Sequence, residues 1–198
     1  MKKNLLGYVL LGLTFVSFPI PDAAAPASQV IRPLGVFDAG LNLGWVNAGK
    51  ANGLFQQNWQ GHAVAARNSL ISAFSPPLRL AWGGTVHDSE NANTGIRGIL
   101  QQYIGFPWFQ LYDGAVGLAW CHVIAQKARC PGCLKNTLFN AGMAIIGAGR
   151  MLGNQAVVHI GTQMQNTSRN MPAQMTPQQM QGYINVVAGF ITGIQRAL

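Results

Sequence analysis

The sequence predicts a mainly α protein, a small helical bundle or helical hairpin with an irregular Gly- and Pro-rich N-terminal segment. Three observations support this prediction. Apolar residues recur at three- and four-residue steps, two apolar segments in the middle of the chain are joined by a short basic turn, and a capped amphipathic segment ends the chain. Together these patterns favour helices packed on one another.

Residues 1–27 have the organisation of a cleavable secretory signal. Two lysines precede an apolar run, 5–18, which is too short to span a bilayer comfortably. Ala25 and Ala27 provide small residues at the positions that a signal peptidase reads, so Ser28 is the predicted mature start. An uncleaved N-terminal anchor and a cut after Ala25 are the alternatives. The segment predicts export to the bacterial periplasm or the cell-envelope membrane.

The chain after the signal divides into two parts. Residues 28–53 contain several glycines without sustained periodicity and predict an irregular segment. Residues 54–198 predict a helical domain. Its first helix begins near Phe55, where apolar residues recur at helical spacing, and Pro76-Pro77 must end it. The stretch 82–94 predicts a polar loop.

Two apolar segments, 104–125 and 138–160, flank a short basic turn, and each contains a single charged residue. One interpretation is that 104–160 is a membrane hairpin whose basic turn faces the cytoplasm by the positive-inside rule. The other is that both segments are core helices of a bundle, which the internal charges of Asp113 and Arg150 favour. Small residues recur along both segments and would let helix backbones approach closely.

The final segment, 176–198, predicts an amphipathic helix. Thr176 is a capping residue, Pro177 takes the first helical position, and Gln179 completes a capping box. Apolar residues then form one stripe, and the opposite face carries amides and hydroxyls without charge. Such a helix suits packing on its own domain, on another subunit, or on a lipid headgroup layer.

Charged residues make up only 9% of the chain, against about 25% in a typical soluble domain. The formal net charge is +8, and no Asp or Glu follows Asp113. The cations are single and scattered, which argues against nucleic-acid binding. A surface this poor in charge predicts burial against other envelope subunits, copies of the chain itself, or lipid. The basic excess suits anionic headgroups or an acidic partner subunit.

The strongest motif for chemistry is the pair Cys130 and Cys133, separated by Pro and Gly. In an oxidising compartment this spacing favours a structural disulfide. A redox-active pair should follow a strand and open a helix whose positive end lowers the thiol pKa, but the preceding residues look helical. A zinc site could add Cys121, but the second spaced pair of a closed site is missing. If 104–160 spans a membrane, the pair lies in the reducing cytoplasm as a dithiol. We predict no metal.

The glycine-rich stretch 143–153 has some features of a dinucleotide-binding loop. That function needs a parallel sheet and an acid about 20 residues further on to hold the ribose, and no acid exists there. We therefore predict no cofactor and interpret these small residues as helix-packing contacts. The candidate packing residues are Gly142, Gly147, Gly149 and Gly153.

The remaining catalytic patterns are weak. Asp88 and Glu90, beside His87, could act as the paired carboxylates of a hydrolase, but acids in a Ser- and Asn-rich loop are commonly solvated turn residues. No nucleophile elbow occurs. The sequence predicts a non-enzymatic structural or accessory subunit of a bacterial cell-envelope assembly, such as a secretion or conjugation apparatus, with no small-molecule substrate. The alternatives are an envelope thiol-disulfide oxidoreductase that uses Cys130 and Cys133, and a cell-wall hydrolase that uses Glu90.

Overall fold

The computed structural model describes residues 31–51, 65, 68–69 and 106–198. Within these residues the chain forms helices and no strand, so the predicted mainly α fold is confirmed there. The helices are α1 (Pro33–Ala51), α5 (Phe106–Lys127), α6 (Pro131–Met151), α7 (Gln155–Asn170) and α8 (Pro177–Ala197). The predicted signal, the helix expected from Phe55 and the loop with Glu90 lie outside the described residues.

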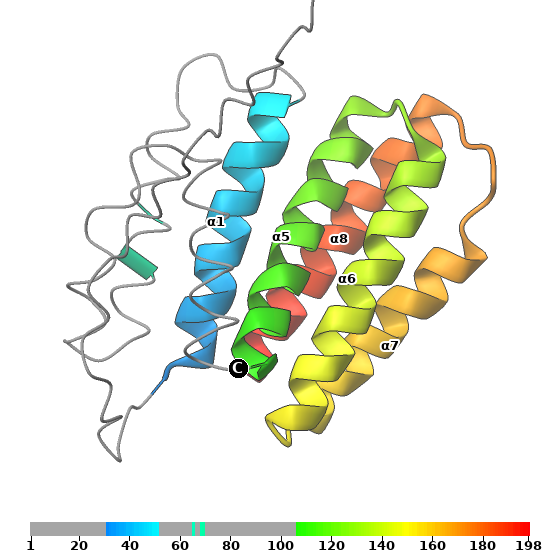
Figure 1. Ribbon diagram of the computed structural model, residues 1–198. Coiled ribbons are helices and arrows are strands. Elements are labelled where there is room, and N and C mark those ends of the chain that lie inside the picture. The colour runs from blue at the N-terminus through cyan, green and yellow to red at the C-terminus, as the bar shows by residue number, and fades with distance from the viewer. Residues whose placement is uncertain (1–30, 52–64, 66–67, 70–105) are drawn as a thin grey trace, which may run out of the picture.

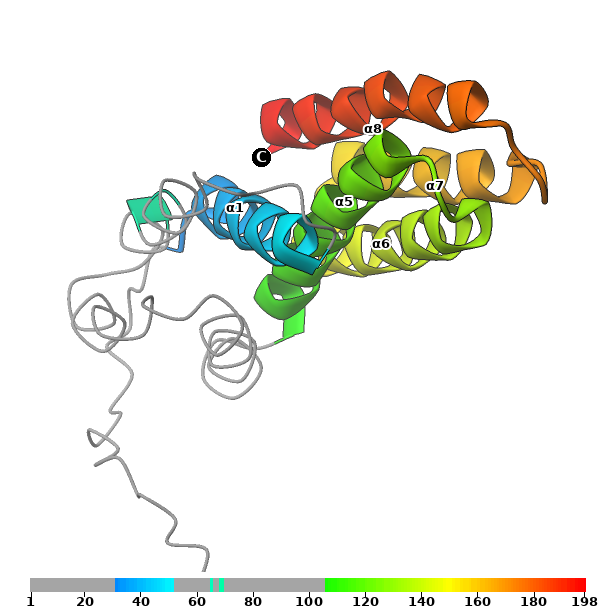
Figure 2. The same ribbon diagram turned by 90° about the horizontal axis from the view of Figure 1, so that it is seen from above.

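Helix α5 lies at the centre of the bundle. Figure 1 shows α5 between α1 and α6, and Figure 2 shows α8 lying against α5 on the side of α7. Within 107–127 only Gln126 is exposed, because three neighbouring helices cover the remainder. A helix that is apolar all round must be buried, and here protein surrounds it. This burial explains the long apolar segment that the sequence shows at 104–125.

The second apolar segment, 138–160, is not one helix. Helix α6 ends at Met151 with Leu152 as its C-cap, and Gly153 adopts a positive φ of 67°. The Asn154 side chain caps α7 by accepting the backbone N–H of Val157 at 3.1 Å. Only a residue without Cβ adopts that φ freely, which fixes the turn at this point. Among the described residues, no helix combines the length and the apolar character needed to cross a membrane.

Helix α1 corrects the prediction of an irregular segment over 28–53. Gly40 and Gly44 are contact positions, not breaks in the helix. A Cβ at Gly40 would lie 2.5 Å from the carbonyl oxygen of Tyr112, and one at Gly44 would lie 2.9 Å from the Cα of Val116. Since residues four apart share a helix face, these glycines let α1 approach α5 closely, and the packing offsets their poor helix propensity.

Helix α8 begins as the sequence predicts. Thr176 Oγ1 accepts the backbone N–H of Gln179 at 3.2 Å, and Gln179 Oε1 accepts the backbone N–H of Thr176 at 2.8 Å. The predicted apolar stripe is buried, and α8 packs mainly on α5. Gln195 was expected on the polar face, but it is partly buried and donates to Asp38 Oδ1 at 2.8 Å, which ties α8 to α1.

Candidate functional site

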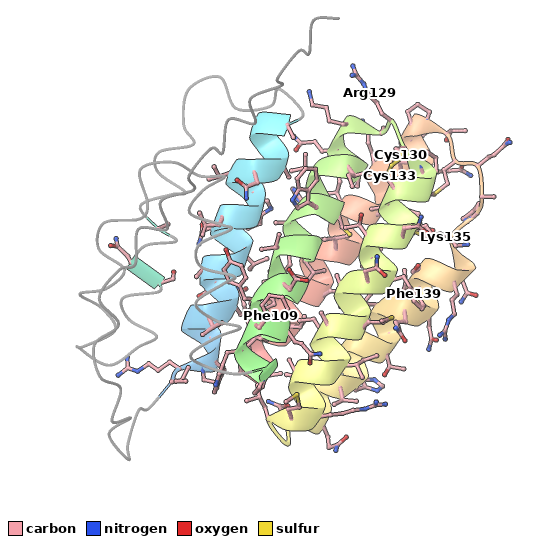
Figure 3. All side chains as sticks on the ribbon, in the orientation of Figure 1. Phe109, Arg129, Cys130, Cys133, Lys135 and Phe139 are labelled. Atoms are coloured by element: carbon pink, nitrogen blue, oxygen red, sulfur yellow. A yellow bond between two sulfur atoms is a disulfide. The ribbon has the colours of Figure 1, made fainter. Side chains whose placement is uncertain are left out.

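The Cys130–Cys133 disulfide lies where the short turn after α5 enters α6 (Figure 3). Cys130 is the N-cap of α6, and Pro131 takes the first helical position. The Cys130 Sγ accepts the backbone N–H of Cys133 at 3.2 Å. Cys133 is exposed and Cys130 is partly buried. The pair follows a helix, as the sequence predicts, but it also opens a 21-residue helix.

The surroundings of the disulfide are cationic. Lys127 ends α5, and Arg129 is exposed beside Cys130. Lys135, on the second turn of α6, donates to the carbonyl oxygens of Arg169 at 3.3 Å and Met171 at 3.1 Å, so its ammonium also caps the end of α7. No acidic residue follows Asp113 in the chain. The positive end of α6 and these side chains therefore act on the disulfide without an opposing carboxylate from the α6 to α8 region.

The third cysteine, Cys121, is free and fully buried in α5. Burial raises the pKa of its thiol far above the ordinary value, since the surrounding core disfavours the thiolate. A thiol in this state is a poor nucleophile and a poor metal ligand. Over the described ranges, no three His, Cys, Asp or Glu side chains come together in a way that could hold a metal ion.

The candidate packing glycines have three different roles. Gly142 and Gly149 lie against α7, because an added Cβ would come within 2.9 Å of Gly161 O and 2.8 Å of Val158 N respectively. Gly147 leaves room for the side chain of Gln110 on α5. Gly153 has no described atom within 4 Å of an added Cβ and serves the turn through its positive φ. The close approach of α6 to α7 thus depends on Gly142, Gly149 and Gly161.

The exposed side of α8 is the uncharged amide and hydroxyl face that the sequence predicts, and it also carries glycines. We define the outer face of α8 as the exposed residues of its middle turns, Gln181, Gly182, Asn185, Val186, Ala188, Gly189 and Thr192; the exposed Arg196 follows in the last turn. No charged residue occurs between Pro177 and Gln195. At Gly182 and Gly189, an added Cβ would meet no described atom within 4 Å. In the sequence, this face is indicated by glycines that occur within the predicted helix at positions outside its apolar stripe.

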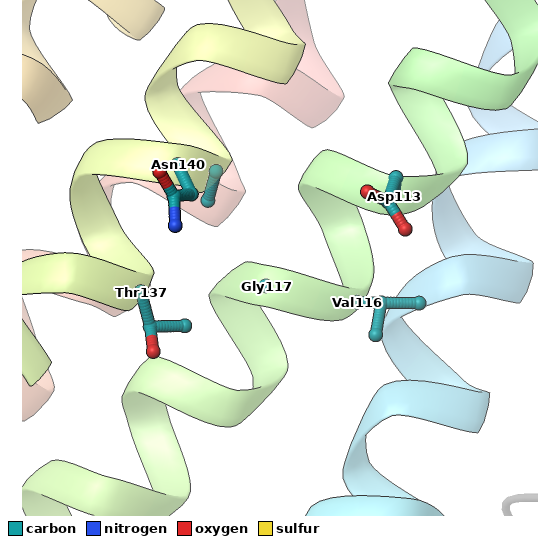
Figure 4. Close-up of a pocket in the computed structure, with 6 residues that line it drawn as sticks. Asp113, Val116, Gly117, Thr137 and Asn140 are labelled. Atoms are coloured by element: carbon teal, nitrogen blue, oxygen red, sulfur yellow. The ribbon is translucent and has the colours of Figure 1, made fainter. Parts of the chain in front are cut away.

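A shallow hollow of about 200 Å³ lies between α5 and α6. It is lined by Asp113, Val116 and Gly117 from α5 and by Thr137, Asn140 and Ala141 from α6 (Figure 4). Binding pockets for small molecules usually measure about 300–1,000 Å³ and surround most of the ligand. The hollow is smaller than that range, and its polar groups are spread along two helices. We therefore assign it no ligand.

Comparison of the chain with family models, curated proteins and solved structures finds no match. Two features of the molecule can indicate its function, the disulfide at the start of α6 and the outer face of α8. The structure does not bring the disulfide together with Cys121, because that thiol is enclosed in the core while Cys133 is exposed.

Proposed function

We propose that the protein is a non-enzymatic structural subunit of a bacterial cell-envelope assembly, such as a secretion or conjugation apparatus, and that the outer face of α8 contacts a neighbouring subunit. The observation that carries this proposal is the pair of glycines, Gly182 and Gly189, on an exposed and uncharged helix face. Three further features support it. These are the signal-like residues 1–27, the shortage of charge and the basic excess.

Glycine within a helix destabilises it by about 0.5–1 kcal/mol relative to alanine. Close approach of another backbone can offset this cost, as it does where Gly40 faces Tyr112. No described residue approaches Gly182 or Gly189 in this way. A helix of another subunit, crossing α8 at these positions, would provide the missing contact.

The spacing of the outer face suits a helical partner. Gly182, Val186 and Gly189 are separated by four and three residues, so they lie along one side of α8. Val186 is 38% exposed and would be covered by the same contact. Since the surface of α6 to α8 carries cations and no acid, an acidic neighbouring subunit is favoured over a second copy of the chain.

The proposal is tested by separating cell envelopes from soluble extract, washing the envelopes with carbonate, extracting the protein in mild detergent and measuring its native mass. We expect the protein in the envelope fraction at a mass well above that of one 21.2 kDa chain. Gly189→Glu places a bulky negative charge on the outer face of α8, where it would repel an acidic neighbour, and should release the subunit. Thr162→Glu, at an exposed position of α7, is the matched control and should not. A soluble, monodisperse monomer of the unaltered protein would show the proposal to be wrong.

A further inference from the structure

We propose that the Cys130–Cys133 disulfide is a thiol-disulfide exchange site that oxidises a cysteine pair of an acidic polypeptide. This site is separate from the outer face of α8, so it does not depend on the proposed assembly. Three observations carry the inference: the exposure of Cys133, the position of Cys130 at the helix start, and the cations around both.

Exposure decides which sulfur is attacked. Thiol-disulfide exchange proceeds by in-line attack of a thiolate on one sulfur, and access to that sulfur limits the rate. Cys133 is exposed, whereas Cys130 is partly buried. The incoming thiolate therefore attacks Cys133 Sγ, and Cys130 Sγ is the leaving group.

The start of α6 stabilises that leaving group. When the disulfide breaks, the bonding electron pair passes to Cys130 Sγ, which becomes a thiolate. The Cys133 N–H already lies 3.2 Å from this sulfur, and the positive end of the 21-residue helix favours negative charge there. A better leaving group speeds exchange, so the local structure favours reduction of this disulfide.

The exchange is balanced in two steps. The first thiolate of the partner forms a mixed disulfide with Cys133 and leaves Cys130 as a thiolate. The partner's second thiol, after losing its proton, attacks the partner sulfur of the mixed disulfide and releases Cys133 as a thiolate. Cys130 and Cys133 end as thiols after taking up two protons. The partner loses two electrons and two protons and gains a disulfide.

Charge selects the partner. Lys127 and Arg129 lie next to the pair, and the chain contains no acid after Asp113 to offset them. Cys133 is also exposed in the first turn of α6, where a polypeptide could reach it. A cysteine pair flanked by Asp or Glu would therefore be attracted to the site, and this attraction would weaken with salt.

The first test measures thiol reactivity against pH by alkylation. Cys133→Ser leaves Cys130 as the reactive thiol, and we expect its apparent pKa to lie below the ordinary value of about 8.5, because the start of α6 favours the thiolate. Cys130→Ser is the matched variant, and its Cys133 should titrate closer to the ordinary value. Cys121 does not interfere, because it is fully buried in the folded protein. A Cys130 pKa at or above that of Cys133 would overturn the inference.

The second test uses the unaltered oxidised protein, so that it does not depend on a variant folding. Two synthetic peptides with the same cysteine pair, one flanked by Asp and Glu and one by Lys and Arg, are compared at low salt. We expect the acidic peptide to be oxidised about ten-fold faster, and we expect Arg129→Gln and 1 M salt each to reduce the ratio. With a single-cysteine acidic peptide, rapid alkylation of the released Cys130 should trap the mixed disulfide on Cys133. Equal rates for the two peptides, or trapping on Cys130, would contradict the proposal.

Discussion

The glycines between α6 and α7 and those on the outer face of α8 differ in the atoms that an added Cβ would meet. At Gly142 and Gly161 an added Cβ would meet the backbone of the opposite helix within 2.9 Å. At Gly182 and Gly189 it would meet no described atom within 4 Å. The first pair has a packing role inside the chain. The second pair has none among the described residues, which is why we assign it to a contact with another subunit.

The comparison shows that a glycine in a helix has to be judged by its neighbour and not by its propensity alone. The same residue type is required where backbones touch, is replaceable where a flexible side chain lies above it, and lowers stability where the space is open. Alanine substitutions along the bundle therefore predict a graded series.

A large effect is expected where the obstacle is backbone, as it is for Gly142→Ala. The new methyl group would lie 2.9 Å from Gly161 O, and a carbonyl oxygen within a helix cannot move aside without separating α6 from α7. We expect the free energy of unfolding to fall by about 2 kcal/mol. Denaturant unfolding followed by circular dichroism measures this change. Gly132→Ala adds a methyl group in open space on the same helix and should leave stability almost unchanged.

An intermediate effect is expected for Gly114→Ala on α5. The added methyl group would meet the side-chain end of Ile145 at 2.6 Å, which is fully buried on α6. Because a side chain can rotate where a backbone cannot, the cost should be about 1 kcal/mol. Combining Gly114→Ala with Ile145→Val should recover part of it in the same unfolding measurement. A loss equal to that of Gly142→Ala would contradict the distinction between backbone and side-chain obstacles.

The opposite sign is expected for Gly182→Ala and Gly189→Ala. Each should raise the free energy of unfolding of the isolated chain by about 0.5–1 kcal/mol, because alanine is the better helix former. The same changes should weaken association in the envelope fraction, since a methyl group would separate α8 from its neighbour. Native mass and unfolding are measured on the same variants. Higher stability with unchanged association would remove the glycine argument for the assembly.

The helices could be predicted largely where the sequence carries local signals. Thr176, Pro177 and Gln179 define the start of α8 by themselves, because capping depends on residues three apart. Helix α1 could not be predicted in this way. Its glycines suggest irregular structure until the facing residues Tyr112 and Val116, about 70 positions away, are known. At these positions tertiary contacts, and not local sequence signals, account for the helix.

The functional features, like the helices, could be predicted only where a local sequence signal exists. The disulfide pair was found from spacing alone, since two cysteines three positions apart can bond directly. Its place at the helix start is not predicted, because the basic residues between the two apolar segments indicate one continuous turn. In the structure Lys127 ends α5 and Pro131 already begins α6, so the turn is much shorter. Gly153, grouped with the packing glycines, acts through its backbone conformation.

The smallest effect is expected on the pH dependence of stability, where a half-buried histidine is compared with an exposed one. His122 on α5 is half-buried against Trp45 of α1, with ring centroids 6.3 Å apart, and burial lowers its pKa. Above the ordinary histidine pKa of about 6.5 the residue is neutral in folded and unfolded chains, so it adds no pH dependence. Below that pH the unfolded chain takes up a proton that the folded chain resists, and stability falls until the pH reaches the folded pKa.

Denaturant midpoints between pH 7.5 and pH 5.5 measure this dependence. His122→Gln should make the unfolding midpoint less sensitive to pH, because it removes a side chain that takes up a proton more readily in the unfolded chain than in the folded one. His159→Gln, at an exposed position of α7 where the ring contacts Gln163, is the matched control and should retain the slope of the unaltered protein. Identical slopes in all three proteins would contradict the lowering of the His122 pKa by burial.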